Sequence, residues 1–234
     1  MLPAVGLGAV FHFVSIVEST RSPDGSWSIR LTEVRQVESL LAFVLIAFFF
    51  GIYTIYRTAS PGIAIFPFSF VLTLSAQSYS GPGPSAVAPS PFSLGWVYIH
   101  IALIIVGYSA LIVSFIASIL YLIQEKSLKA KGISGFWSRL PALATIDEIG
   151  YRCLIFGFPF MTFGLIAGSI LAEAKFGAEY FKDPKVLLSA LMWLVYTILL
   201  YTRWSAGWRG RRAAYLAACA FAAAAVAWVA NIHG

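Results

Sequence analysis

Charged residues are scarce in this sequence. Only 11% of its 234 residues are charged, whereas an ordinary soluble domain carries about 25%. Hydrophobic residues make up 59% of the chain, and the mean hydropathy is +0.83. A water-exposed globular domain is therefore excluded.

Residues that carry common chemistry are also few. The two cysteines, Cys153 and Cys219, lie in apolar runs, which excludes a disulfide scaffold and a cysteine-based metal site. Three histidines leave little room for a multi-histidine metal centre. The chain has no phosphate-binding glycine loop and no His-Glu-x-x-His, Gly-x-Ser-x-Gly or Cys-x-x-Cys motif. Soluble-type hydrolases, ATPases and c-type cytochromes are thereby excluded, and no motif in the chain predicts an enzyme.

Long apolar runs dominate what is present. A membrane-spanning helix needs about 17–25 predominantly apolar residues. Four runs fit that length, and three shorter ones are too apolar for a water-exposed loop. The seven runs cover residues 2–17, 38–57, 61–76, 95–123, 153–172, 187–202 and 212–231. We therefore predict an all-α, polytopic membrane helix bundle with about seven transmembrane helices, forming one domain over residues 1–234. The first run lacks the basic start of a signal peptide, so we interpret it as a true helix and expect a further helix upstream.

The positive charges lie between these runs and predict the orientation. The net charge is +6, but its distribution is typical of topology determinants and does not indicate a nucleic-acid partner. With the N-terminus inside, ten of the sixteen Lys and Arg residues fall in inner loops and six in outer ones. The positive-inside rule therefore predicts an inner N-terminus and an outer C-terminus.

This orientation brings two histidines to the outer face. His100 lies near the outer end of the fourth predicted span, and His233 lies just past the seventh. Neutral imidazole is a haem-iron ligand, and two imidazoles from different helices can bind one iron axially. The residues alone leave open an alternative, in which each histidine is hydrogen-bonded to a headgroup or loop at the interface.

The outer segment 173–186 is aromatic. Phe176, Tyr180 and Phe181 fall within six residues, which suits packing against a planar porphyrin, and nearby lysines could meet its propionates. An ordinary aromatic belt at the membrane interface explains the same pattern equally well.

His12 falls close to the predicted middle of the bilayer. It lies about ten residues, or roughly 15 Å, into the first span. An ionisable residue at this depth indicates a functional site by default. A neutral histidine hydrogen-bonded within the bundle is the alternative. Glu38, at the outer start of the second span, could cap that helix, pair with Arg35 or orient a ligand.

The sequence resembles the cytochrome c assembly protein family, whose members include the CcsA and CcmC types, and is most similar to the HemX-type members. The resemblance extends over nearly the whole chain. It rests on Ala9-Val-Phe-His12, Glu38-Ser-Leu40, Tyr98-Ile-His100 with Gly107-Tyr108, Arg152 through Gly-Phe-Pro to Thr162, Asp183-Pro-Lys185, Trp208-Arg-Gly-Arg-Arg212 and Ile232-His-Gly234.

The resemblance implies a haem b cofactor held at the outer face of a bacterial cytoplasmic membrane. His100 and His233 match the family's two outer histidines, which would ligate the iron, and His12 ends the stretch of the first span that carries the resemblance. The family's outer loop, Trp-Gly-x-x-Trp-x-Trp-Asp-Pro-Lys-Glu, is matched by Phe176, Tyr180 and Asp183, whereas its third Trp is a lysine here and its final Glu is a valine. The haem-presenting loop is thus degenerate.

One departure affects the implied function. CcsA-type proteins carry a histidine in a Tyr-Leu-His-x-Arg stretch, where this chain has Tyr201. The resemblance implies a protein that holds or delivers haem for cytochrome c maturation, in the lipid bilayer and with a maturation partner. Two alternatives remain: a HemX-type accessory protein that acts on a cytoplasmic tetrapyrrole-synthesis enzyme, and a structural subunit of a membrane complex that has lost haem.

Overall fold

The computed structural model describes residues 2–21, 33–78, 91–129 and 141–233. These residues form seven α-helices and one short 3₁₀ helix, which confirms that the protein is all-α as predicted. In chain order they are α1 (Leu2–Ser19), α2 (Val34–Tyr56), α3 (Gly62–Ser78), α4 (Pro91–Lys129), α5 (Leu143–Phe176), η2 (Ala178–Lys182), α6 (Pro184–Ser205) and α7 (Arg211–His233).

Four of these helices contain segments long and apolar enough to cross a membrane. The segments are Arg35–Tyr56, Gly95–Lys129, Leu143–Ala174 and Val186–Ser205. Two further apolar helices, Pro3–Ser19 and Gly62–Ser78, are shorter than the four segments and are not counted among the clear spans. A membrane helix bundle with four clear spans is therefore supported, and the remaining predicted spans, on α1, α3 and α7, stay predictions.

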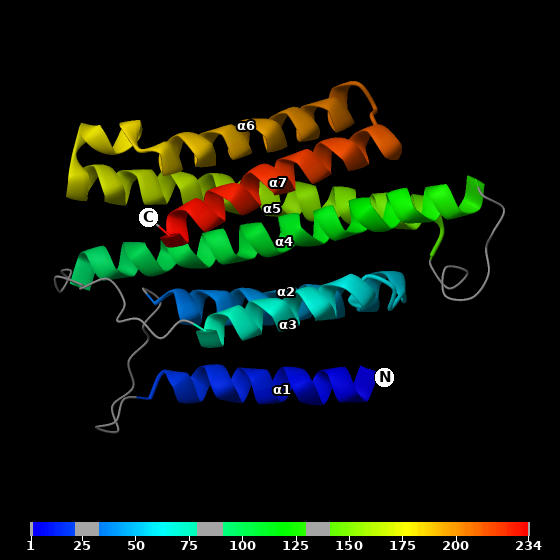
Figure 1. Ribbon diagram of the computed structural model, residues 1–234, viewed down its shortest axis with the longest axis horizontal. Coiled ribbons are helices and arrows are strands. Elements are labelled where there is room, and N and C mark those ends of the chain that lie inside the picture. The colour runs from blue at the N-terminus through cyan, green and yellow to red at the C-terminus, as the bar shows by residue number, and fades with distance from the viewer. Residues whose placement is uncertain (1, 22–32, 79–90, 130–140, 234) are drawn as a thin grey trace.

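Helices that follow one another in the chain run antiparallel, and they are arranged in layers (Figure 1). α1 lies at one side, α2 and α3 form the next layer, and α4 packs between that layer and α5, α6 and α7. The beginning of α4, the ends of α5 and α7, η2 and the beginning of α6 lie at one end of the bundle, here called the His100 end. The end of α4, the beginning of α5 and the α6–α7 turn lie at the opposite end, here called the Arg203 end.

Glycines allow α4 and α5 to approach closely along their length. Gly150, Gly157 and Gly164 recur every seven residues on α5 and face α4. A Cβ atom at Gly157 would lie 2.7 Å from Cβ of Ala110, and one at Gly164 would lie 2.7 Å from Cδ1 of Ile104. Small residues at such an interface let helix backbones pack directly in a membrane. This register brings the start of α4 against the last turns of α5.

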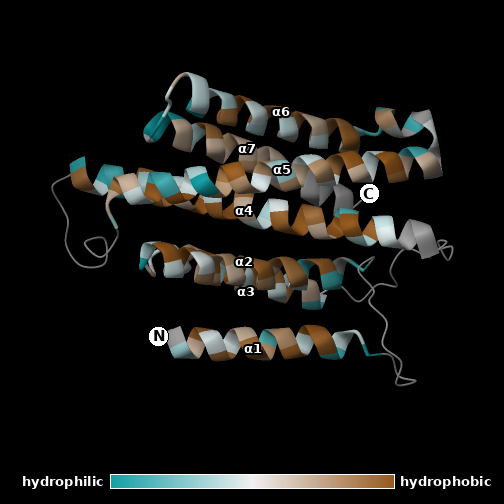
Figure 2. Ribbon diagram, turned by 180° about the vertical axis from the view of Figure 1, so that it is seen from behind, coloured by the Kyte–Doolittle hydropathy of each residue, from teal (hydrophilic) through white to brown (hydrophobic). Residues whose placement is uncertain are grey.

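Two clusters of buried side chains hold the layers together. The first joins α2, α3, α4 and the first turns of α5 around Leu45, Phe49 and Ile65. The second joins α4, α5, α6 and α7 and includes Leu111 and Met192. Many large apolar side chains are also exposed on the outside of the bundle. Figure 2 colours hydrophobic residues brown, and they occur along all the helices.

The clearest example is α1, which exposes apolar side chains on the outside of the bundle. Leu7, Val10 and Phe11 are each more than half exposed. In water such a face would be unfavourable, whereas in a bilayer it contacts acyl chains. The bilayer is thus the environment that the surface fits.

Helix ends differ from the predicted spans where polar residues extend a helix. α4 continues to Lys129 instead of ending at residue 123, and α5 begins at Leu143 instead of residue 153. In the added turns Lys129 pairs with Glu125 at 2.7 Å and Arg152 with Glu148 at 2.6 Å, both four residues apart. Such pairs support helical turns that a search for apolar runs does not detect.

Candidate functional site

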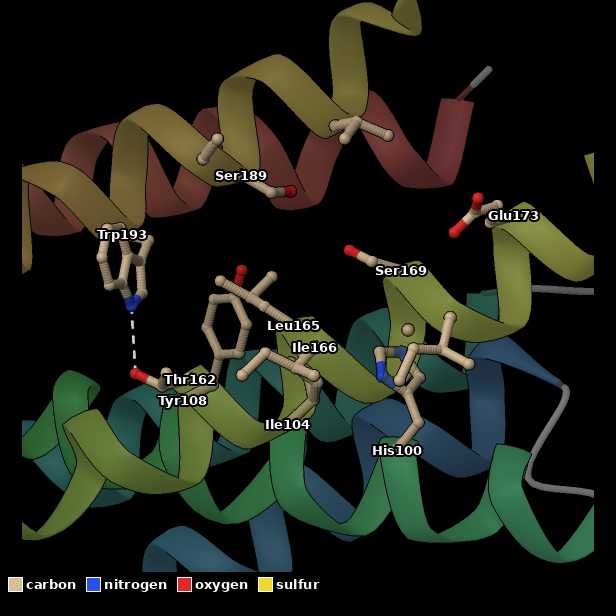
Figure 3. A pocket seen from close by; sticks show the side chains of 14 residues that line it. His100, Ile104, Tyr108, Thr162, Leu165, Ile166, Ser169, Glu173, Ser189 and Trp193 are labelled. Atoms are coloured by element: carbon tan, nitrogen blue, oxygen red, sulfur yellow. Dashed lines mark hydrogen bonds between the residues drawn. The ribbon is translucent and has the colours of Figure 1, made fainter. Parts of the chain in front are cut away.

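A cavity of about 580 Å³ lies between α4, α5 and α6 in the half of the bundle at the His100 end (Figure 3). α4 and α5 pack closely along their length, whereas α5 and α6 have little direct contact, which leaves space between them. The walls of the cavity are mostly apolar, with a few polar groups from each of the three helices. The side chains used below are His100 and Tyr108 of α4, Thr162, Ser169 and Glu173 of α5, and Ser189 and Trp193 of α6.

The imidazole of His100 is held in one orientation by α5. Its Nδ1 lies 2.7 Å from the carbonyl oxygen of Gly164, and its ring packs against Gly168, where a Cβ atom would lie 2.5 Å from Cε1. A carbonyl oxygen can only accept a hydrogen bond, so Nδ1 carries the hydrogen and donates it. In the neutral ring Nε2 then keeps its lone pair and can bind a metal ion.

The wall opposite His100 is a fixed indole. Nε1 of Trp193 donates a hydrogen bond to Oγ1 of Thr162 at 3.0 Å, and that hydroxyl donates to the carbonyl oxygen of Phe158 at 2.8 Å. The rings of Trp193 and Phe158 also stack, with centroids 6.0 Å apart and planes 24° apart. The hydroxyl of Tyr108 donates to Sδ of Met192 at 3.3 Å. These bonds keep flat aromatic surfaces facing the cavity.

Polar groups mark the side of the cavity nearest the His100 end. Figure 3 shows the carboxylate of Glu173 and the hydroxyls of Ser169 and Ser189 around the space next to His100. A concave, mostly apolar cavity with a few directed polar groups is typical of a small-molecule site. Because His100 lines the cavity and its Nε2 keeps a lone pair, the cavity suits a flat apolar ligand that carries a metal ion.

The other residues predicted for an outer site are placed at the same end of the bundle. Phe176 is the last residue of α5, Tyr180 lies in η2, and Asp183 directly precedes α6. His233 is the last residue of α7, whose C-terminus lies toward the His100 end in Figure 1. The side chains of Phe176, Tyr180 and His233 lie outside what the structure describes, so their contacts with the cavity stay predictions.

His12 lies apart from this cavity. Its Nε2 is 3.0 Å from Oγ of Ser39, and its ring meets the edge of Phe43, both on α2. The structure therefore does not bring it together with His100. Glu38 is likewise a bundle residue: it is buried and accepts a 2.8 Å hydrogen bond from the hydroxyl of Ser75 on α3.

Several residues of the cavity are not evident from the sequence. Trp193 lies in an apolar run and belongs to no motif. Thr162 ends the Gly-Phe-Pro-x-x-Thr stretch, but nothing in that stretch marks it as the partner of Trp193. Gly164 and Gly168 offer a weak signal, since they are spaced four residues apart on one face of α5. Their meeting with His100 depends on the register between two helices, which the sequence does not specify.

The comparisons with known proteins identify the family. The family model described as "Cytochrome C assembly protein" matches residues 27–229. The chain belongs to the cytochrome c assembly protein family. This confirms the resemblance stated above at the level of the family.

The curated relatives carry the name "Cytochrome c biogenesis protein CcsA". The protein of Guillardia theta is 34% identical over 149 residues, which cover 57% of this chain and 48% of the relative. That of Chlamydomonas reinhardtii is 37% identical over 128 residues, covering 54% and 35%. That of Synechococcus sp. (strain CC9311) is 29% identical over 160 residues, covering 57% and 52%. The chain thus spans about half the length of these relatives or less. No solved structure matches it significantly.

The chain is therefore a membrane protein of the cytochrome c assembly family, and its four long apolar helices make it a multi-pass one. The names of the relatives do not indicate a HemX-type protein.

Proposed function

We propose that this chain holds haem b in the His100 cavity, at the outer face of a bacterial cytoplasmic membrane, for cytochrome c maturation. The observation that carries the proposal is the state of His100, whose Nδ1–H is bound by the carbonyl of Gly164 so that Nε2 is left for a metal ion. The family supports a haem ligand in general, and the cavity supports its position.

The residues of the cavity fit a porphyrin. A volume of about 580 Å³ is within the range of roughly 300–1,000 Å³ that small-molecule pockets occupy. Ile104, Leu165 and Trp193 provide apolar and aromatic walls, and His100 provides a metal ligand. Described residues include no cluster of three or more His, Cys, Asp or Glu side chains suited to a bare metal ion. A metal carried within a macrocycle therefore suits the cavity better than a free ion does.

When bound, haem supplies an iron with axial coordination positions and the porphyrin that is to be attached to a cytochrome. The protein's part is to bind and orient. The Gly164 carbonyl keeps the His100 ring in one tautomer and one direction, and the Trp193–Thr162 bond keeps the indole from closing the cavity. His233 is proposed as the second axial ligand, because α7 ends toward the His100 end.

We propose holding or delivery at the outer face rather than passage of haem from the inside. The position where CcsA-type proteins carry a membrane histidine is Tyr201 here, and that side chain is 66% exposed on the outside of α6. It therefore faces away from the bundle and is not placed to bind a ligand within it. The same observation favours a HemX-type accessory role as the second candidate, with a cytoplasmic tetrapyrrole-synthesis enzyme as partner.

A spectrum of the purified protein tests the proposal. The protein, prepared in neutral detergent from cells that make haem, is expected to show a Soret band that is lost or shifted in His100→Ala. His12→Ala is the matched control, because His12 lies on α1 with Ser39 and outside the cavity, and its spectrum is expected to match the parent. Protein free of haem after reconstitution would contradict haem binding and favour a structural subunit. Copurification of a cytoplasmic enzyme would favour the HemX-type role.

A further inference from the structure

A second cavity, of about 720 Å³, lies at the Arg203 end, between the end of α4, the beginning of α5 and the α6–α7 turn. It shares no lining residue with the His100 cavity. Three arginines and two tyrosines line it together with apolar side chains: Arg152, Arg203, Arg209, Tyr121, Tyr151 and Ile155. The positive-inside rule places this end on the cytoplasmic side.

One of the arginines is already neutralised. Arg203 is 7% exposed, and its guanidinium lies 2.8 Å from Oδ2 of Asp147. Oδ1 of the same carboxylate accepts a 3.2 Å hydrogen bond from the backbone N–H of Gly210, and the guanidinium lies 4.8 Å from the ring centroid of Tyr151. Asp147 is thus fully engaged, and its charge does not repel an incoming anion. The pair joins α5 to α6 and to the turn that carries the next arginine.

Arg209 is the cation that remains. The lining contains three arginines and two carboxylates, and the second carboxylate, Glu148, pairs with Arg152 at 2.6 Å on the surface of α5. Within the described part of the chain Arg209 has no ion-pair partner, and it is exposed at the cavity. The cavity therefore has one positive charge in excess, and that charge is available to a ligand.

The lining from α5 reaches toward the hydrocarbon level of the bilayer and ends at an apolar residue, Ile155. Leu143 is the first residue of α5, and Ile155 lies twelve residues, or about 18 Å, further along that helix. The Ile155 side chain is 44% exposed. On the adjacent end of α6, Trp204 is 82% exposed, as is typical of tryptophan at a membrane–water interface. The cavity thus combines cationic groups with an exposed apolar side chain at its deeper end.

We propose that this cavity binds an anionic phospholipid, with its phosphodiester group beside Arg209 and an acyl chain along Ile155. Basic pockets between transmembrane helices at the cytoplasmic side are suited to such headgroups, because attraction to anionic lipid adds to burial of apolar surface. A zwitterionic lipid lacks the net charge, and a soluble phosphate ester lacks the chain. The proposal is independent of haem binding, since the two cavities share no residue.

Lipid retention tests this assignment. The protein is placed in nanodiscs of phosphatidylglycerol and phosphatidylcholine with identical acyl chains, released, and analysed by native mass spectrometry. Arg209→Gln is expected to lower the retention of phosphatidylglycerol relative to phosphatidylcholine about fivefold, which corresponds to the roughly 1 kcal/mol that one cation contributes near an anionic surface. Arg209→Lys keeps the charge and is expected to retain most of the preference.

Arg57→Gln is the matched control. Arg57 is exposed at the C-terminal end of α2, at the same end of the bundle, and does not line the cavity. The Arg57→Gln variant is expected to retain phosphatidylglycerol like the parent.

Equal retention of phosphatidylglycerol by the parent and Arg209→Gln, or equal losses in both Gln variants, would overturn the proposal. Displacement of the lipid by soluble glycerophosphoglycerol at equal concentration would assign the cavity to a phosphate ester. Loss of haem from Arg209→Gln with unchanged lipid retention would assign it to a porphyrin's carboxylates.

Discussion

The imidazole ring of His100 occupies the space that a side chain at position 168 would fill. A Cβ atom built on Gly168 would lie 2.5 Å from Cε1 and 2.8 Å from Nδ1 of that ring. These distances are too short for real contacts, so the position of His100 in the cavity requires glycine on α5. The relationship links a residue without any side chain to the proposed metal ligand.

Gly168→Ala is therefore expected to displace the His100 ring from the Gly164 carbonyl. Haem affinity should fall about 10- to 100-fold, as is typical when the support of a ligating histidine is lost. Haem titration of the purified variants, followed at the Soret band, measures the change. Gly95→Ala is the control, because Gly95 lies on α4 with open space around it. Parental affinity in Gly168→Ala would show that His100 does not need this packing.

Trp193→Phe should loosen the cavity wall. The substitution removes the N–H that donates to Thr162, and loss of one such hydrogen bond costs about 0.5–1.5 kcal/mol. We expect faster haem dissociation and a slightly lower melting temperature. Trp204→Phe provides the comparison on the same helix, since Trp204 is 82% exposed and lines neither cavity. Similar dissociation rates in the two variants would contradict a role for the Trp193–Thr162 bond.

The ion pair between Arg203 and Asp147 should contribute more to stability than the neighbouring pair between Arg152 and Glu148. Asp147→Asn leaves the buried Arg203 without a charged partner, and breaking a buried pair in this way costs about 3–5 kcal/mol. Glu148→Gln removes a pair whose side chains are 64% and 48% exposed, for which about 0–1 kcal/mol is expected. Thermal unfolding in detergent compares the two variants. Equal melting temperatures would mean that Arg203 finds another partner or water.

The close packing of α4 and α5 depends on glycine, so replacing a glycine at their interface should destabilise the protein. A Cβ atom at Gly157 would lie 2.7 Å from Cβ of Ala110, and overpacking of this kind costs about 1–3 kcal/mol. Gly157→Ala should therefore lower the melting temperature. Gly51→Ala, at a helical position with nothing within 4 Å, should raise it slightly because alanine favours helix. An increase in both variants would show that the helices separate easily.

The sequence predicts the helices of this protein well and their contacts poorly, for a physical reason. Long apolar runs locate the helices, because burial in lipid depends on composition alone. The polar turns that extend α4 to Lys129 and start α5 at Leu143 are not detected, because their residues are polar or charged and a search for apolar runs passes over them, although ion pairs four residues apart support these turns. His100 is found as a candidate because the predicted topology brings it to the outer face with His233 and because it matches an outer histidine of the family. Its partners Gly164 and Trp193 are not, because they depend on how three helices pack.

We predict that His100 and His233 both ligate the haem iron, because the fold brings their two helices to the same end of the bundle. α7 runs antiparallel to α6 and packs against α4, where the rings of Phe221 and Phe115 stack with centroids 4.0 Å apart. Its twelve remaining residues then lead toward the His100 end, where α7 ends at His233.

Two imidazoles make haem iron six-coordinate and low-spin, so His233→Ala should open one axial position and give a high-spin spectrum that added imidazole reverses. His100→Ala should show the same spectral change with weaker haem binding, because His100 is fixed by α5 whereas His233 is near the chain end. A low-spin spectrum in His233→Ala at full haem occupancy would mean that another side chain supplies the second ligand.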